Sequence, residues 1–247
     1  MSESESGISV DTWERTKGYG GKPVQAMDRR LFMQLLVFEC QGKLQPGQAI
    51  DGLAGGLREH GAGALIYSDL NNPRGIALLS WSETPEDFVT KVRPAFSPPA
   101  LSELKLLPNQ TMIGRSYSTG YEPDLDYWLL KRPVETALNP EWPWAVWYPL
   151  RRSGAFEKLE DREKGGILRE HAEIGKAYGA ANLVHDIRLA CHGLDWNDNE
   201  FVLGLIGKEL HPLSHVVQAM RKTKQTSEYI VQMGPFFVGH VAWRSGT

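Results

Sequence analysis

The stretch WYPLRRSGAFEKLEDREKGGILREHAEIGKAY, at 147–178, decides the fold that we predict for this chain. Its start reads as a strand that ends at Pro149, because proline lacks the N–H that a sheet ladder needs. Its second part reads as a helix with one side toward the core. Residues three and four apart share that side, namely Leu168, His171, Ile174, Gly175 and Tyr178.

The pattern strand–helix–strand, strand–helix–strand occurs twice along the chain. Strand-like apolar runs occupy 31–38, 64–68, 75–81, 111–117, 144–148, 183–191, 201–206 and 235–241, with helical patterns at 46–59, from 84, at 160–178 and at 212–221. The fragment GGLREHG at 55–61 resembles GGILREH at 165–171. We therefore predict two similar α+β modules, each an antiparallel sheet with helices on one face.

These modules set the expected domain boundaries. The first module is predicted at 26–120 and the second at 144–247, with a Pro-rich and aromatic linker at 121–143. Residues 1–25 are polar and Gly-rich and are expected to form a flexible arm.

Composition excludes several classes of protein. A formal net charge of −3 gives no basic footprint for nucleic acid. No apolar run reaches 18 residues, so neither a transmembrane helix nor stable membrane association is expected. The acidic start differs from a secretory signal, which favours a cytoplasmic protein. Cys40 and Cys191 are too few for a disulfide framework and are expected to be buried thiols.

Among the seven histidines, His171 has the most informative position. It lies on the apolar side of the predicted helix, with Gly175 one turn further on. A missing side chain at Gly175 would let a flat macrocycle approach the backbone, or it would simply ease contact between helix and sheet. The local pattern leaves both interpretations open.

Tyr148 and Trp147 precede Pro149 and must face opposite sides of the sheet. A buried tyrosine usually has a hydrogen-bond partner, and Arg151 or Arg152 could supply one or hold a carboxylate. The alternative is an ordinary core aromatic followed by solvated arginines.

Four motifs follow one another along the second half: YPLRR at 148–152, LREHAEIGKAYG at 168–179, GLD at 193–195 and MGPFFVG at 233–239. In this order and spacing they resemble the chlorite dismutase superfamily, most closely its coproheme decarboxylase branch. The resemblance in sequence extends over most of the second half. In the first half only the arrangement of strands and helices is similar. The resemblance implies two ferredoxin-like modules fused into a dimeric α+β barrel, assembled as a homo-oligomer, commonly a ring of five.

The resemblance also implies the chemistry. His171 would be the iron ligand of a haem, and Tyr148 stands where coproheme decarboxylases have their radical-forming tyrosine. In those enzymes, peroxide is the co-substrate and the tyrosyl radical takes hydrogen from a propionate. Loss of carbon dioxide leaves a vinyl group, and two rounds convert iron coproporphyrin III to haem b.

Other residues are expected to hold the porphyrin. Arg151 and Arg152 lie where the family has a propionate-holding lysine, and Arg132, or Lys131 beside it, would do similar work. Arginine suits this task because its planar fork binds carboxylates through two bonds. Trp147 and Gly175 are also expected to contact the cofactor.

The residue opposite the iron is open between two candidates. Asp186 and Arg188 share one face of the strand after the helix. Counting back from GLD places Asp186 there, and a shift of two residues places Arg188 there. Asp186 could act as a base toward peroxide. Near 222–227, a Thr or Gln replaces the family's acidic partner of the iron-binding imidazole.

We therefore predict a cytoplasmic coproheme decarboxylase, with transient contact to the chelatase that inserts iron. Three rivals stay open. The chain could degrade chlorite with Arg188, bind or transfer haem without turnover, or be a structural module without haem, since ferredoxin-like folds host many functions.

Overall fold

The computed structural model describes residues 9–18 and 23–246. Its main strands are β3 (Phe32–Cys40), β4 (Ala64–Asp69), β5 (Gly75–Ser82) and β7 (Met112–Arg115) in the first half, then β8 (Trp144–Arg152), β9 (His185–Ala190), β10 (Phe201–Gly207) and β12 (Phe237–Arg244) in the second. The paired strands of this sheet all run antiparallel. The mixture of helices and a large antiparallel sheet confirms the predicted α+β class.

The two halves have the same strand order. The first sheet runs β7-β3-β5-β4, and the second runs β12-β8-β10-β9, so each strand pairs like its counterpart. Pairing of β4 with β12 and of β7 with β9 joins the sheets, and β8 pairs with both β12 and β10. The main sheet therefore closes into a barrel of two ferredoxin-like modules. Short strands β6 (Leu104–Leu106) and β11 (Ile230–Met233) extend β3 and β8.

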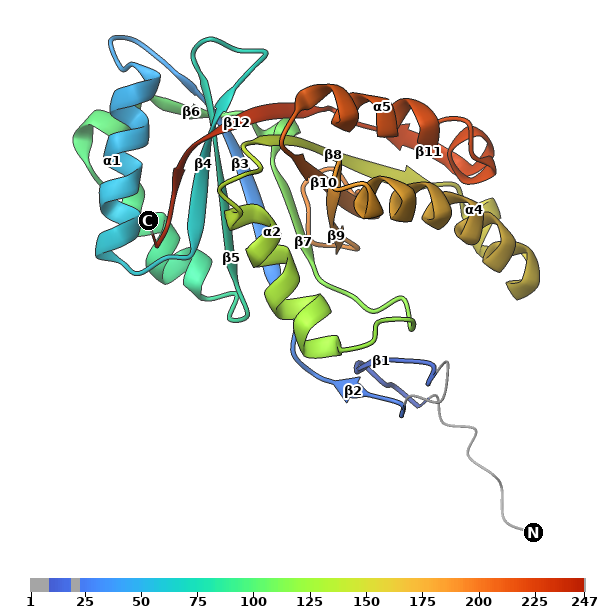
Figure 1. The fold of residues 1–247 in the computed structure, drawn as a ribbon. Helices are drawn as coiled ribbons and strands as arrows, with labels where there is room; N and C mark the ends of the chain where they lie inside the picture. The colour runs from blue at the N-terminus through green and yellow to red at the C-terminus, as the bar shows by residue number, and fades with distance from the viewer. Residues whose placement is uncertain (1–8, 19–22, 247) are drawn as a thin grey trace.

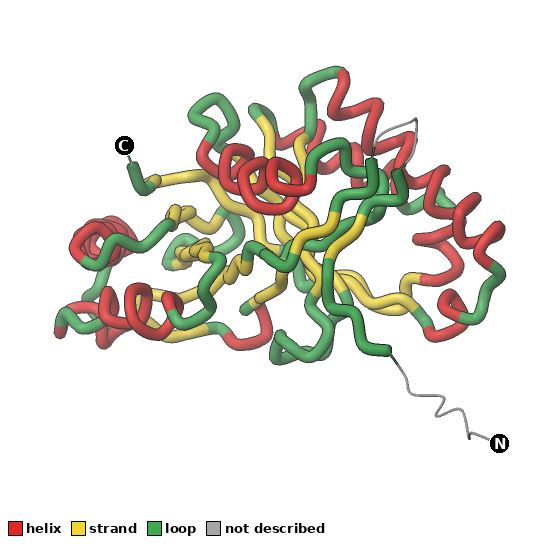
Figure 2. The backbone as a smooth tube through the Cα atoms, turned by 90° about the horizontal axis from the view of Figure 1, so that it is seen from below, coloured by secondary structure: helices red, strands yellow, loops and turns green. Residues whose placement is uncertain are grey.

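The barrel encloses one apolar core, and each sheet has a second core on its outer face. The interior contains the fully buried Trp147, whose ring lies against Gly204. A Cβ at Gly204 would stand 2.6 Å from that indole, so no larger residue fits there. Helix α1 (Pro46–Glu59) covers the first sheet, and α4 (Asp161–Ala180) and α5 (Leu210–Met220) cover the second. Figure 1 shows α1 on one side of the molecule and α4 and α5 on the other, and in Figure 2 helices flank the strands.

The predicted helix that begins near Thr84 is wrong as a regular α-helix. The chain there forms short turns of π and 3-10 geometry, η2 (Phe88–Val92), η3 (Arg93–Phe96) and η4 (Pro99–Glu103). Prolines at 94, 98 and 99 each remove a backbone donor. Pro98, which precedes Pro99, also leaves the helical region, with ψ 131°, and ends the helical turns of η3.

The predicted linker is partly helical and belongs to the core. It contains η6 (Tyr127–Lys131) and α2 (Arg132–Leu138), with Pro133 in the first turn. Leu129, Leu130 and Ala137 pack into the barrel core. The remaining short elements are α3 (Gly154–Glu157), η5 (Pro108–Gln110) and η7 (Gln225–Tyr229).

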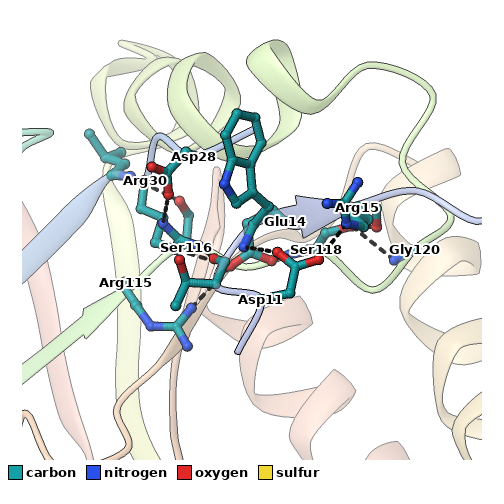
Figure 3. Close-up of polar contacts among 12 residues, drawn as sticks. Asp11, Glu14, Arg15, Asp28, Arg30, Arg115, Ser116, Ser118 and Gly120 are labelled. Atoms are coloured by element: carbon teal, nitrogen blue, oxygen red, sulfur yellow. Dashed lines mark hydrogen bonds and ion pairs between the residues drawn. The ribbon is translucent and has the colours of Figure 1, made fainter. Parts of the chain in front are cut away.

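The N-terminal arm is attached to the barrel from Glu14 to Lys17. Residues 1–8 and 19–22 of the predicted flexible segment lie outside the described residues. Strand β1 (Glu14–Arg15) pairs with β2 (Ala26–Met27). The Glu14 carboxylate accepts hydrogen bonds from the Ser118 amide at 2.8 Å and from Arg115 at 3.2 Å (Figure 3). This part of the arm is therefore bonded in place rather than loose.

Two further expectations concern cysteines and membranes. Cys40 and Cys191 are both buried free thiols, as predicted. Across residues 9–18 and 23–246, each helix is too short or too polar to span a bilayer.

Candidate functional site

The outer face of the second sheet brings together the residues that the sequence singles out. Residues directly opposite in antiparallel strands point to the same face. Across β8, β10 and β9, one such row is Tyr148, Leu203 and Arg188, and the next is Val146, Leu205 and Asp186. Helices α4 and α5 cover this face. The expectation that Asp186 and Arg188 share a face is confirmed, and that face lies opposite the helix of His171.

Tyr148 is buried beneath the helices, with 6% of its surface exposed. Its ring stacks on Phe236 with centroids 4.7 Å apart. Burial, followed by the negative charge of Asp186, raises the pKa of the Tyr148 phenol well above its usual value. At neutral pH the hydroxyl therefore keeps its proton.

His171 projects from α4 toward the same space. Its Nδ1 lies 3.5 Å from the Thr223 hydroxyl oxygen. That hydroxyl donates its proton to the Met220 carbonyl at 2.8 Å, so only its lone pairs are available to the imidazole. This arrangement favours the tautomer with the proton on Nδ1, and it leaves Nε2 as a free lone pair.

The electrostatic surroundings keep the His171 ring neutral. Burial and then the positive charge of Arg188 lower the pKa of His171, against smaller opposing effects of Glu170 and Asp186. A neutral imidazole with one free nitrogen is the form that binds a metal.

Asp186 is held between two arginines. Arg132 donates to its carboxylate and to its backbone carbonyl, both at 2.8 Å, and Arg188 Nε lies 2.9 Å from the other carboxylate oxygen. Burial opposes ionisation of Asp186, but the two guanidinium groups outweigh it and hold the pKa below its usual range. Asp186 is therefore a fixed carboxylate and a weak base, which disfavours the predicted role as a base toward peroxide.

Helix α4 packs less tightly on its sheet than α1 does. It buries only Ile167, whereas α1 buries four residues. Beside His171, Leu168 is 42% exposed, and a Cβ added at Gly175 would meet only Met220 Cε, at 3.7 Å. An apolar side next to a free imidazole nitrogen fits a flat metalloporphyrin. Within the described chain, no group of three or more His, Cys, Asp or Glu side chains is arranged for a metal ion.

Two of the predicted porphyrin-binding arginines are committed to other partners. Arg152 bonds to the Glu200 carboxylate through Nε at 3.0 Å and through Nη2, and its side chain is 12% exposed. Arg151 donates to Gln232 at 2.6 Å and lies 3.4 Å from Asp198. Among the described residues, neither is bonded to the Tyr148 hydroxyl, which leaves the other alternative, that these arginines hold a carboxylate, as a prediction.

Trp147 is not brought to the site. It points into the barrel, opposite to Tyr148, and its Nε1 lies 3.3 Å from the Tyr67 hydroxyl. The alternation of adjacent residues is confirmed, but the structure does not support the expected contact of Trp147 with a cofactor.

Several neighbours of the site were not predicted from the sequence. Phe236, the ring that stacks on Tyr148, stands inside the motif at 233–239 and could have been found there. Thr223 falls within the segment where the sequence indicated Thr or Gln, and the structure identifies it. Tyr117, whose ring lies 5.5 Å from that of Phe201, carried no signal in the sequence pattern.

A pocket lies where the linker meets β9. Its volume is about 20 Å³, and its walls are Ser116, Tyr117, Glu122, Trp128, Leu129, Arg132, Pro133 and Arg188. Arg188 therefore belongs both to this pocket and to the sheet face under α4.

Comparison with known proteins agrees with this geometry. The solved structures that share the fold include a haem-binding protein from Thermus thermophilus, with TM-score 0.68, 17% identity and coverage of 89% of this chain and 93% of that one. They also include the chlorite dismutase of Candidatus Nitrospira defluvii in complex with imidazole, with TM-score 0.68, 15% identity and coverage of 86% of this chain and 91% of that one. No curated protein sequence matches the chain. The family model described as chlorite dismutase matches residues 113–242, which include both Tyr148 and His171. The chain thus belongs to the chlorite dismutase family of haem-dependent oxidoreductases.

Proposed function

We propose that this protein converts iron coproporphyrin to haem b by peroxide-dependent oxidative decarboxylation. The observation that carries the proposal is the buried phenol of Tyr148 on the sheet face that α4 and His171 cover. A tyrosine there can be oxidised beside a bound porphyrin, and burial protects the resulting radical from water.

His171 and Tyr148 would have different roles in this reaction. His171 Nε2 would bind the iron, and the bound porphyrin supplies the oxidising power when it reacts with peroxide. Tyr148 would lose one electron and its hydroxyl proton, then take a hydrogen atom from a propionate. Each round consumes one propionate, one peroxide and one proton, and it yields a vinyl group, carbon dioxide and two waters. Two rounds give haem b.

The Tyr148→Phe variant tests the proposal. It keeps the ring and its stacking on Phe236 but removes the hydroxyl, so porphyrin binding should persist while decarboxylation stops. Tyr67→Phe is the matched control, since Tyr67 is also buried but lies in the barrel core. Chromatography of the porphyrin products after peroxide addition measures the outcome. Continued formation of haem b by Tyr148→Phe would refute the proposal.

A second candidate is chlorite degradation, favoured by one observation. Arg188 lies in the same row as Tyr148, so a positive charge is available on the face opposite His171. Oxygen release on mixing the haem-loaded protein with chlorite would favour this function. Bleaching alone, with either reagent, would favour a haem-binding protein without turnover.

A further inference from the structure

Helices α4 and α5 lie side by side over the second sheet, and a tyrosine–histidine pair joins them (Figure 1). The Tyr178 hydroxyl on α4 is hydrogen-bonded to Nδ1 of His215 on α5, and the two rings lie 5.9 Å apart. A phenol is a stronger proton donor than a neutral imidazole, so Tyr178 donates and His215 carries its own proton on Nε2. The proposed reaction uses neither residue.

Tyr148 and Tyr178 both pack in the outer core of the second module, but their hydroxyls have different surroundings. No described residue is hydrogen-bonded to the Tyr148 hydroxyl. The Tyr178 hydroxyl instead meets an imidazole, which can accept a proton. A phenol loses an electron more readily when its proton can move to a base at the same time. Tyr178 is therefore a second oxidisable tyrosine on this side of the molecule.

The pair connects the helix of the candidate site with the solvent. His171 and Tyr178 are seven residues apart on α4, so they share one side and lie about 10 Å apart along the helix axis. Ile174 packs between them on the same core. At the other end, His215 is exposed. An electron can cross packed protein over this distance, and a small solute can reach the imidazole.

We infer that Tyr178 and His215 form an oxidation site through which a soluble, hydroxyl-bearing reductant returns electrons to the porphyrin iron when no propionate is left to react. The inference rests on the proposed function, because the oxidant is the porphyrin iron that peroxide has oxidised. Such a path protects the product from unused oxidising power.

The electrons and protons of this path balance. Tyr178 loses one electron to the oxidised iron, and its hydroxyl proton moves to His215 Nδ1. The reductant then gives one electron to the phenoxyl group, and the proton returns from His215 to the phenol oxygen. Over two such cycles, one peroxide, two electrons from the reductant and two protons give two waters.

The first test needs no porphyrin. Photo-oxidation of the full chain with ruthenium tris-bipyridyl and persulfate, in the presence of N-acetyltyramine, labels each phenoxyl group that forms, and peptide mass spectrometry locates the label. Tyr127 is 39% exposed and serves as the internal reference for accessibility. Tyr178 is less exposed than Tyr127, yet we expect it to take up more label, because its proton acceptor is in place.

Two variants of α5 separate proton transfer from the mere connection of the helices. His215→Asn keeps a hydrogen-bond acceptor for Tyr178 but takes up no proton, so labelling of Tyr178 relative to Tyr127 should fall by about 100-fold, the lower end of the effect of a positioned proton acceptor. His211→Gln is the matched control, since His211 is one turn away on α5, with its ring 5.8 Å from that of His215. Labelling in the control should not change.

The second test uses the protein loaded with haem b, with peroxide and ascorbate added together. Tyr178→Phe should lose the Soret absorption faster than the unaltered protein, because electrons from ascorbate no longer reach the iron. Tyr229→Phe is the matched control, since Tyr229 is also half-buried but packs against Phe156 rather than an imidazole.

The outcomes separate the inference from the proposed function. Equal labelling of Tyr178 in His215→Asn and in the unaltered protein would overturn the inference, as would equal bleaching of Tyr178→Phe and Tyr229→Phe. If both differences appear but the unaltered protein forms no haem b from iron coproporphyrin, the oxidation site stands and decarboxylation falls.

Discussion

The imidazole of His171 is contacted by the hydroxyl of Thr223. A carboxylate in that place would attract the imidazole proton more strongly. Thr223 accepts from Nδ1 only weakly, at 3.5 Å, and is itself 1% exposed. A neutral partner orients the ring but leaves it less electron-rich than a charged one would. A less electron-rich imidazole would support strong peroxidase activity less well.

Thr223→Val tests this contact. Valine has nearly the same shape as threonine but no hydroxyl, so the His171 ring loses the group that orients it. Affinity for the porphyrin iron should fall by about tenfold, which is the lower end of the effect of losing a group that hydrogen-bonds to a metal-binding histidine. Titration followed at the Soret band measures it. Thr226→Val is the control, because its hydroxyl contacts Thr223, at 3.2 Å, and not the imidazole. Equal affinities of the two variants would contradict the role of Thr223.

Glu200 and Arg152 join two elements near the site. The carboxylate bonds to the Arg152 side chain and, at 2.9 Å, to its backbone amide, which ties the segment before β10 to the end of β8. Burial opposes ionisation of Glu200, but the hydrogen bonds from Arg152 outweigh it and lower the pKa of Glu200. The pair therefore stabilises the ionised, folded state.

Glu200→Gln should lower the free energy of unfolding at pH 7 by about 1.5–3 kcal/mol. The folded pKa is depressed, so this stability is present above the unfolded value of about 4.3 and is lost as pH falls through the folded pKa. The difference between variant and unaltered protein should shrink below about pH 4. Urea unfolding at several pH values measures it. Glu157→Gln is the control, since Glu157 is 3.5 Å from Arg152 but 63% exposed, and a similar loss there would contradict the prediction.

The elements were largely predictable because their apolar periods are regular. Helix α1 was predicted at 46–59, the bounds that it has, and most of the main strands lie within a few residues of their predicted ranges. The prediction that a strand ends at Pro149 is wrong, because β8 continues through Pro149, which pairs with Val202, to Arg152. The helical part of the linker was missed because prolines at 123, 133, 140 and 143 masked a short apolar period. Proline is compatible with the first helical turn, where Pro133 stands.

The site was predictable where neighbours in sequence determine it. Alternation along a strand gave the opposite faces of Trp147 and Tyr148, and the shared face of Asp186 and Arg188. Ion pairs could not be predicted, because the partners come from distant segments. Glu200 is 48 residues from Arg152, and Asp186 is 54 from Arg132. No spacing rule connects such positions.

At the scale of the whole molecule, the N-terminal arm is bonded to the end of the first module and to the start of the linker. Ser118 donates to the Arg15 carbonyl at 2.9 Å, and Lys17 donates to the Gly120 carbonyl at 2.8 Å. Gln25 adds bonds to the backbone at Pro123 and Leu125. The arm thus holds the loop from 116 to 125, which contributes Ser116, Tyr117 and Glu122 to the pocket.

Glu14→Gln should loosen that loop without unfolding the protein. Loss of a charge-assisted bond of about 1–2 kcal/mol should raise amide hydrogen exchange in 116–125 by about 5- to 30-fold, while exchange in α5 stays the same. Mass spectrometry of the exchanged peptides measures both. Asp11→Asn is the control, since its ion pair with Arg15 stays within the arm. Unchanged exchange in the loop would show that the arm does not hold it.

Helices α1 and α4 occupy equivalent places in the two modules but are packed unequally, so the two modules should respond differently to substitution. In the first module, α1 packs closely on its sheet, so substitutions there should act mainly on the free energy of unfolding. In the second module, α4 packs less closely on its sheet. Side-chain changes between them should therefore alter ligand binding without unfolding the barrel.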